Sequence, residues 1–107
     1  MRKHQIEASL QSLKSALDAG FSGVEIFIFG SSATGKHADD SDIDVLVLLP
    51  FEPDIDTEEK IFNIAYDIEL EHGIVFGIIV YSKEFWLSDL ARAMPLHWNI
   101  DREGARI

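Results

Sequence analysis

The stretch that organises this chain is residues 29–49, which read Phe-Gly-Ser-Ser-Ala-Thr-Gly-Lys-His-Ala-Asp-Asp-Ser-Asp-Ile-Asp-Val-Leu-Val-Leu-Leu. It starts at the end of an apolar, partly β-branched run, 24–29, which predicts a strand that stops at Gly30. It finishes with residues 43–49, which predict a second, largely buried strand that Pro50 ends. The stretch therefore predicts two strands joined by a short segment rich in Gly, Ser and Thr.

Apolar residues at helical spacing predict one helix before these two strands and another after them. A first helix, with a left-handed C-cap at Gly20, is predicted by the spacing of Ile6, Leu10, Leu13 and Leu17. Asp56 or Thr57 can cap a second helix, which ends at residues 72–73 and turns four apolar residues inward: Ile61, Ile64, Ala65 and Ile68.

The remainder of the chain predicts one more strand and one more helix. Residues 74–81 read as a third strand. Ser82 can cap a final helix, which stops at Pro95 and carries Phe85, Trp86, Leu90 and Met94. The resulting order, α-β-turn-β-α-β-α, predicts an α/β (α+β) fold with a small mixed sheet and helices packed on it.

Composition limits the classes of function. With 107 residues, of which 47% are hydrophobic and 26% charged, residues 1–107 are expected to form a single folded domain. The net charge of −10 argues against direct DNA binding and means that bound triphosphate would need divalent cations. The absence of cysteine and of any apolar run long enough to span a membrane leads us to expect a cytoplasmic protein.

Two carboxylates mark the candidate chemistry. Asp42 and Asp44 are two residues apart at the start of a strand, so their side chains leave the same face and can share one cation. Such oxygen ligands suit Mg²⁺, which completes its shell with water and substrate phosphates. Gly30 and Ser31 offer backbone N–H groups and a hydroxyl to a phosphate. Together these residues predict a cradle for a metal-bound triphosphate.

Competing readings of the same stretch fit less well. Residues 30–36 match most of a phosphate-binding loop, but His37 stands where that motif needs Ser or Thr. A calcium loop beginning at Asp40 would need Gly at Val45 and Glu at Phe51. A plain turn explains Asp40 but not Asp44, because a lone carboxylate in an apolar strand is costly unless it is paired or metal-bound.

The Gly30-Ser31 pair, the ten-residue spacer and the Asp42-Ile43-Asp44 run with its apolar strand resemble the signature of the DNA polymerase β-like nucleotidyltransferase superfamily. The chain is particularly similar to the minimal nucleotidyltransferases of HEPN/MNT toxin–antitoxin pairs. The resemblance implies the nucleotidyltransferase fold, with Gly30 and Ser31 holding the triphosphate and with Asp42 and Asp44 as the catalytic, metal-ligating residues.

The implied reaction transfers a nucleoside monophosphate, AMP if the nucleotide is ATP, to a hydroxyl and releases pyrophosphate with the help of Mg²⁺. For the antitoxin relatives the acceptor is a tyrosine of the partner toxin, so a HEPN-type toxin is the implied partner; a homo-oligomer is the other expectation. Arginines often follow Gly-Ser in the family, whereas here Lys36 is the nearest cation that could meet phosphate, or else is a solvated loop residue.

The chain departs from the family at one further position. Active members carry a third carboxylate on the next strand, where Gly77 is the counterpart in this sequence. Glu69 and Glu71 could replace it but are more simply solvated helix charges. The alternative function is therefore a degenerate member that binds its partner with little or no transferase activity. An exposed aromatic residue among Phe85, Trp86 and Trp98 would mark a partner surface.

Overall fold

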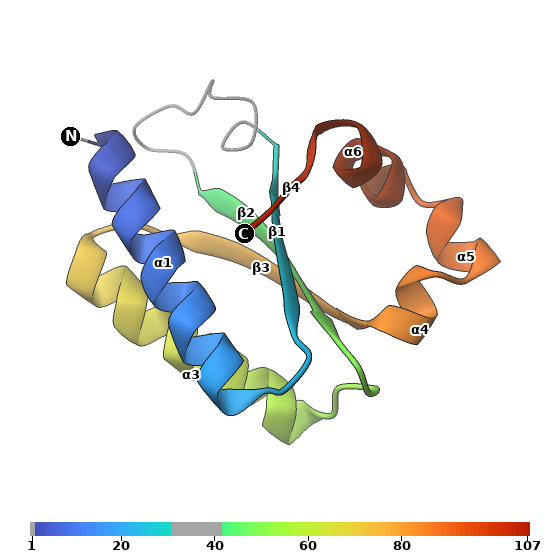
Figure 1. Ribbon diagram of the computed structural model, residues 1–107, viewed down its shortest axis with the longest axis horizontal. Helices are drawn as coiled ribbons and strands as arrows, with labels where there is room; N and C mark the ends of the chain where they lie inside the picture. The colour runs from blue at the N-terminus through green and yellow to red at the C-terminus, as the bar shows by residue number, and fades with distance from the viewer. Residues whose placement is uncertain (1, 31–41) are drawn as a thin grey trace.

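The structure is a computed structural model that describes residues 2–30 and 42–107. Figure 1 shows how its elements are arranged. In chain order they are α1 (Arg2–Gly20), β1 (Glu25–Phe29), β2 (Ile43–Leu49), α3 (Ile55–His72), β3 (Phe76–Ser82), α4 (Lys83–Trp86), α5 (Asp89–Arg92), α6 (Pro95–Glu103) and β4 (Ala105–Arg106).

The described strands form a four-stranded sheet in the order β3-β2-β1-β4. Strand β1 runs antiparallel to β2 and to β4, whereas β2 and β3 run parallel because α3 connects them. The two-residue β4 at the end of the chain was not predicted. The mixed sheet with packed helices confirms the predicted α/β (α+β) fold class.

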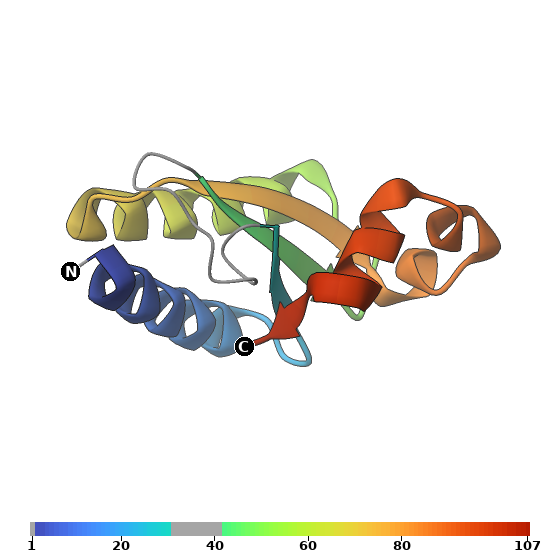
Figure 2. The same ribbon diagram turned by 90° about the horizontal axis from the view of Figure 1, so that it is seen from above.

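The larger hydrophobic cluster lies between the sheet and helices α1 and α3. We call this side of the sheet the core face. Leu10, Leu13 and Leu17 of α1 are buried there, as their spacing predicts. Alternate residues of β2 complete it, which are Ile43, Val45, Val47 and Leu49. Figures 1 and 2 show α1 and α3 together at one side of the molecule.

A smaller cluster covers the opposite side of the sheet, which we call the site face. Leu46 and Leu48 of β2 contribute to it together with Trp86 of α4 and Ile100 of α6. The ring of His97 stacks on Trp86 with centroids 4.3 Å apart, and its Nε2 atom lies 3.1 Å from the Trp86 carbonyl oxygen. His97 thus ties α6 to α4 over this part of the sheet.

Two predicted helix ends were wrong. Helix α1 continues through Gly20, and the left-handed residue is Gly23, with φ of 80°. Gly20 stays helical because the Phe21 N–H donates to the Leu17 carbonyl, which closes the last turn of α1 around Gly20. The cap of α3 is Asp54 instead of Asp56 or Thr57, since its carboxylate accepts from the Thr57 N–H at 2.8 Å.

The predicted final helix is also wrong in part. Ser82 caps α4 as expected, but the helix ends after four residues and α5 follows with its own cap, Ser88. Pro95 begins α6 instead of only stopping the preceding helix, because proline fits the first turn, where its missing N–H is not needed. None of the described helices is long and apolar enough to cross a membrane.

Candidate functional site

Asp44 lies where three strands meet at one end of the site face. It is the second residue of β2 and pairs with Phe29 of β1 on one side and Gly77 of β3 on the other. Because side chains alternate along a strand, Asp44 points to the same face as Leu46 and Leu48. Its side chain is half-buried, unlike the buried residues that follow it in β2.

Two glycines make room for the Asp44 carboxylate. Gly30 has a left-handed backbone, with φ of 70°, and a Cβ atom there would lie only 2.6 Å from Asp44 Oδ2. A Cβ atom on Gly77 would lie 3.2 Å from Asp44 Oδ1. A glycine within a β-branched strand is a known sign of close approach, so the sequence carried a signal for this second contact. We call Gly30, Asp44 and Gly77 the glycine cradle.

Of the other predicted site residues, Asp42 is described by the structure, whereas Ser31 and Lys36 lie outside the described residues. Asp42 is exposed and lies just before β2, two residues from Asp44. Proteins usually bind Mg²⁺ through one or two carboxylates, and water and substrate phosphates complete its coordination. The carboxylates of Asp42 and Asp44 therefore fit this ion. Within the described residues no group of three or more metal-ligating side chains gathers.

Gly77 is the residue for which the family resemblance led us to expect a third carboxylate. The parallel register of β2 and β3 places Gly77 directly beside Asp44. Glu69 does not fill the gap, because its Oε2 atom accepts from the Phe76 N–H at 2.7 Å. Phe76 packs in the core-face cluster, whereas Asp44 points to the opposite face. Glu69 therefore anchors the start of β3.

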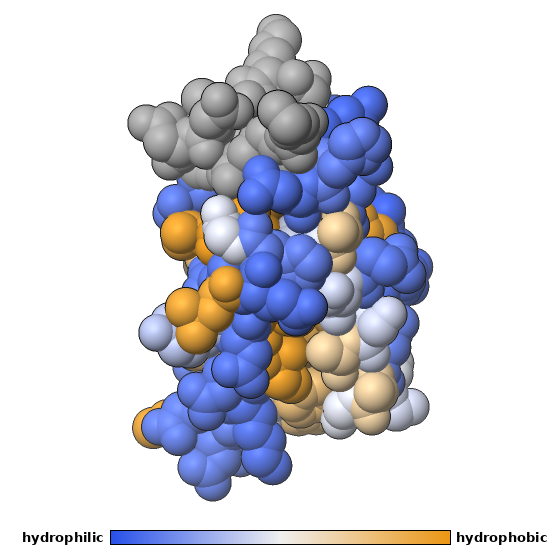
Figure 3. All heavy atoms as spheres, turned by 90° about the vertical axis from the view of Figure 1, so that its left-hand side faces the viewer, coloured by the Kyte–Doolittle hydropathy of each residue, from blue (hydrophilic) through white to orange (hydrophobic). Residues whose placement is uncertain are grey.

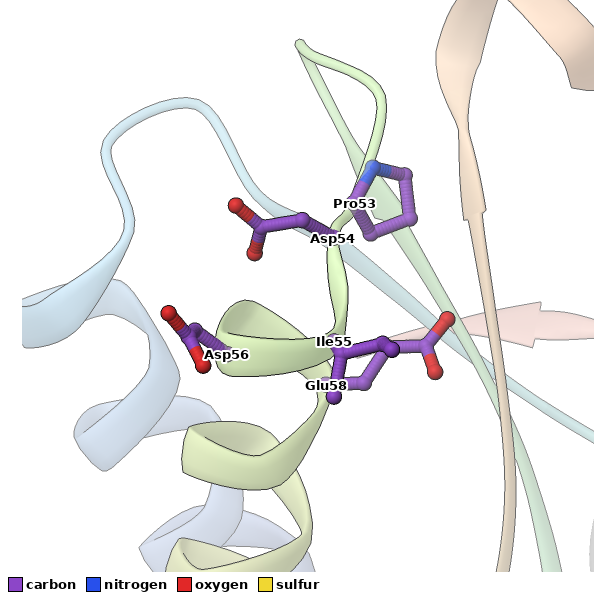
Figure 4. A pocket seen from close by; sticks show the side chains of 5 residues that line it. All are labelled: Pro53, Asp54, Ile55, Asp56 and Glu58. Carbon is purple, nitrogen blue, oxygen red and sulfur yellow. The ribbon is translucent and has the colours of Figure 1, made fainter.

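A separate acidic hollow lies at the other end of β2, where α3 begins. Figure 4 shows Asp54 and Asp56 pointing to one side of it while Glu58 extends to the other. The Thr57 backbone N–H that bonds to Asp54 lowers the pKa of that carboxyl below its ordinary value of 3.8. These carboxylates do not converge, so we assign them to capping the helix and not to binding metal.

The aromatic residues near the chain end divide between core and surface. Trp86 is buried, whereas the Trp98 side chain is 66% exposed. The Trp98 Nε1 atom donates to the Arg92 carbonyl at 2.8 Å, which fixes the ring against α5. Trp98 thus meets the condition under which the sequence predicts a partner surface.

Known proteins resemble this chain in sequence. The nucleotidyltransferase domain family matches residues 10–93, a span that includes every predicted site residue. One candidate protein adenylyltransferase of Methanocaldococcus jannaschii is 36% identical over 58 residues, 54% of this chain and 59% of that relative. The match thus spans less than two thirds of that protein. A second one from the same organism is 28% identical over 100 residues, 92% of this chain and 93% of its own length.

Solved structures share the fold. A toxin–antitoxin with AMP-PNP aligns with a TM-score of 0.60 and 18% identity, covering 94% of this chain and 70% of the other. A mutant of the toxin–antitoxin MntA–HpeT aligns with a TM-score of 0.61 and 14% identity, covering 90% and 69%. These likenesses establish the fold, and the family match extends over more than half of the sequence. The chain belongs to the nucleotidyltransferase domain family.

Proposed function

We propose that residues 1–107 form a single Mg²⁺-dependent nucleotidyltransferase domain that transfers AMP from ATP to a hydroxyl group. The glycine cradle carries this proposal, because it holds the Asp44 carboxylate at the start of β2, beside the end of β1 and next to Gly30. A left-handed glycine at that point lets a phosphate approach the backbone closely. Family membership supports the reaction class.

The proposed roles follow from the chemistry of each side chain. Asp42 and Asp44 would hold Mg²⁺, and Gly30, Ser31 and Lys36 would bind the phosphates. The bound cation would neutralise charge on the triphosphate and orient it for in-line attack. A new bond then forms between the acceptor oxygen and the α-phosphorus, the bond from that phosphorus to the pyrophosphate oxygen breaks, and the hydroxyl proton passes to solvent.

The acceptor is proposed to be a tyrosine of a partner protein. Support comes from relatives described as protein adenylyltransferases and from the fold shared with a toxin–antitoxin. We propose a HEPN-type toxin as the partner. The negative charge of this chain, −10, is consistent with a protein acceptor in preference to nucleic acid.

A second candidate function is partner binding without transfer. Gly77 favours it, because this glycine lies beside Asp44, at the position where the family resemblance implies a third carboxylate. Without that group, Asp42 and Asp44 would still hold the nucleotide-bound metal, but a second metal that would activate the acceptor would lack a ligand. Nucleotide binding with no turnover would be the signature of this function.

Calorimetric titration with ATP, with and without Mg²⁺, tests the proposed site. We expect metal-dependent binding by the natural chain and none by Asp42→Asn/Asp44→Asn, because the amides cannot neutralise the cation. Asp54→Asn is the matched control, since it removes an exposed carboxylate at the opposite end of β2. Equal ATP binding by the double variant would refute the metal site.

Turnover separates the two candidate functions. The chain, the partner toxin and ATP labelled at the α-phosphate are incubated with Mg²⁺, and label on the toxin is measured. Transfer of label to a toxin tyrosine supports the enzyme. Metal-dependent ATP binding without label transfer supports the partner-binding alternative.

A further inference from the structure

Helix α3 carries an apolar row that does not face the core. Its inward residues Ile61, Ala65 and Ile68 are buried. Phe62, Tyr66 and Leu70 are 46%, 56% and 66% exposed, respectively. They are spaced four residues apart, so they follow one another along one side of the helix for about 12 Å. We call these three residues the outer row. A surface helix with nothing more to bury carries polar residues at such positions.

A hollow of about 330 Å³ lies beside the outer row, between α3 and β3. Phe62 and Tyr66 line it from the helix and Ile78 from the strand. Strand β3 is an edge of the described sheet, so this side of the molecule offers both an apolar helix face and a shallow groove. Figure 3 shows the side with α1 and α3, where hydrophobic side chains interrupt a largely hydrophilic surface.

The surroundings of the outer row are acidic. Helix α3 contains six carboxylates and, among Lys and Arg, only Lys60. Glu58, Glu59 and Glu69 lie three or four positions from Phe62 or Tyr66, which makes them neighbours of the outer row on the helix surface. A second copy of this chain would bring the same carboxylates to the contact and be repelled. The charge pattern selects a basic partner.

The edge of β3 is less suited to an added strand than to a helix. The Ile43 N–H donates to the Val75 carbonyl, so the Val75 backbone carbonyl is directed toward β2. The backbone N–H and C=O groups of the next residue, Phe76, are therefore directed away from β2, toward the open edge. The outward Phe76 N–H is already bonded to the Glu69 carboxylate at 2.7 Å. An incoming strand would have to displace this bond, whereas a helix lying along α3 would leave it intact.

We propose that the outer row and the adjoining hollow bind an amphipathic helix of another protein, whose apolar side is flanked by Lys or Arg. The partner's apolar residues cover Phe62, Tyr66 and Leu70 while its basic residues meet Glu58 and Glu59. The surface lies on α3 and on the core-face side of β3, whereas the Asp44 carboxylate of the glycine cradle points to the opposite, site face. Binding of a helix at this surface therefore does not depend on nucleotide transfer by the chain.

The test uses a defined probe and the full chain. A synthetic helical peptide with Leu at every third or fourth position and Lys beside them is titrated into ¹⁵N-labelled protein, and amide shifts are followed. We expect saturable changes centred on residues 58–70 and 76–78. A peptide of the same sequence with Glu in place of Lys should not bind.

Variants make the result specific. Phe62→Ser/Tyr66→Ser should weaken binding of the Lys peptide by at least about tenfold, as expected when interface anchors are truncated. Leu87→Ser/Leu90→Ser removes two comparably exposed residues elsewhere, at 63% and 70%, and should leave binding unchanged. Thermal melts and Mg²⁺-dependent ATP titration of each variant report on folding and on the proposed nucleotide site independently.

Several outcomes would overturn the docking surface. These are shift changes outside α3 and β3, equal binding by Phe62→Ser/Tyr66→Ser, equal binding of the Glu peptide, or no binding of the Lys peptide. A dimer of the protein alone that Phe62→Ser/Tyr66→Ser dissociates would assign the surface to self-association instead. None of these results depends on whether ATP is bound.

Discussion

The core face and the site face of the sheet differ in the helices that cover them and in how completely they are packed. The core face is covered by two helices of 19 and 18 residues, and alternate residues of β2 are buried against them. The site face is covered by α6 and by the four-residue α4, and the four-residue α5 packs against these two helices. At one end of that face the packing gives way to a half-buried carboxylate between two glycines.

This difference separates the residues that stabilise the fold from those that position the candidate site. On the core face many apolar side chains share the stabilisation, so no one contact sets the function. On the site face the position of one carboxylate depends on two missing side chains, at Gly30 and Gly77. Changes on the core face should therefore cost stability, and changes at the cradle should cost ligand binding.

The largest loss of stability is expected on the core face. Leu17→Ala removes a side chain with 0% exposure and should lower the free energy of unfolding by about 2–5 kcal/mol, because a cavity remains. Leu87→Ala, at a side chain 63% exposed, should change it by no more than about 0.5 kcal/mol. Urea denaturation measures both. A similar loss in the two variants would contradict the contrast between buried and exposed leucines.

The cradle provides a sharper test, because its two glycines differ. Gly30→Ala places a Cβ 2.6 Å from Asp44 Oδ2 and forces a left-handed alanine, which costs roughly 1–2 kcal/mol before any clash. Gly77→Ala meets Asp44 Oδ1 at 3.2 Å and needs a shift of only a few tenths of an ångström. Both should weaken Mg²⁺-dependent ATP binding, Gly30→Ala more strongly.

Gly20 supplies the matched control for both cradle glycines. It is helical, and a Cβ atom there meets nothing within 4 Å. Gly20→Ala should therefore raise the free energy of unfolding by about 0.4–1 kcal/mol and leave ATP binding unchanged. If Gly30→Ala and Gly20→Ala bound ATP equally well, the cradle would have no part in the nucleotide site.

The smallest effect is expected at the start of α3. Hydrogen bonding lowers the pKa of Asp54 in the folded chain, so its stabilising contribution is present at neutral pH and is lost as pH falls below 3.8 through the folded pKa. Asp54→Ala should lower the melting temperature at pH 7 and flatten this acid dependence. Asp54→Asn keeps an N-cap acceptor without ionising, so it should flatten the dependence with less loss at pH 7.

Melting curves between pH 2.5 and 7 compare the three chains over the relevant range, roughly one unit or more on each side of an ordinary aspartate pKa. An unchanged acid dependence in Asp54→Asn would show that other carboxylates control it. The loss of thermal stability at low pH would then come from carboxylates other than the α3 cap.

Apolar periodicity was enough to predict most of the fold. The inward residues of α1 and α3 and the span of β2 agree with the structure, because burial repeats every 3.6 residues in a helix and every two in a strand. Helix ends were harder, since a cap depends on which side chain reaches a free N–H. Asp54, Asp56 and Thr57 all have suitable oxygens, and geometry chose Asp54.

The sequence by itself determined the family signature, the pair Asp42 and Asp44, and the absence of a carboxylate from the third strand. Only the tertiary structure decided that Gly77 stands beside Asp44, that Glu69 bonds to Phe76, and that Phe62, Tyr66 and Leu70 lie outside the core. The physical reason is that strand register and helix orientation bring together residues far apart in the chain. Local patterns fix what a segment becomes, while its neighbours in space are fixed by packing.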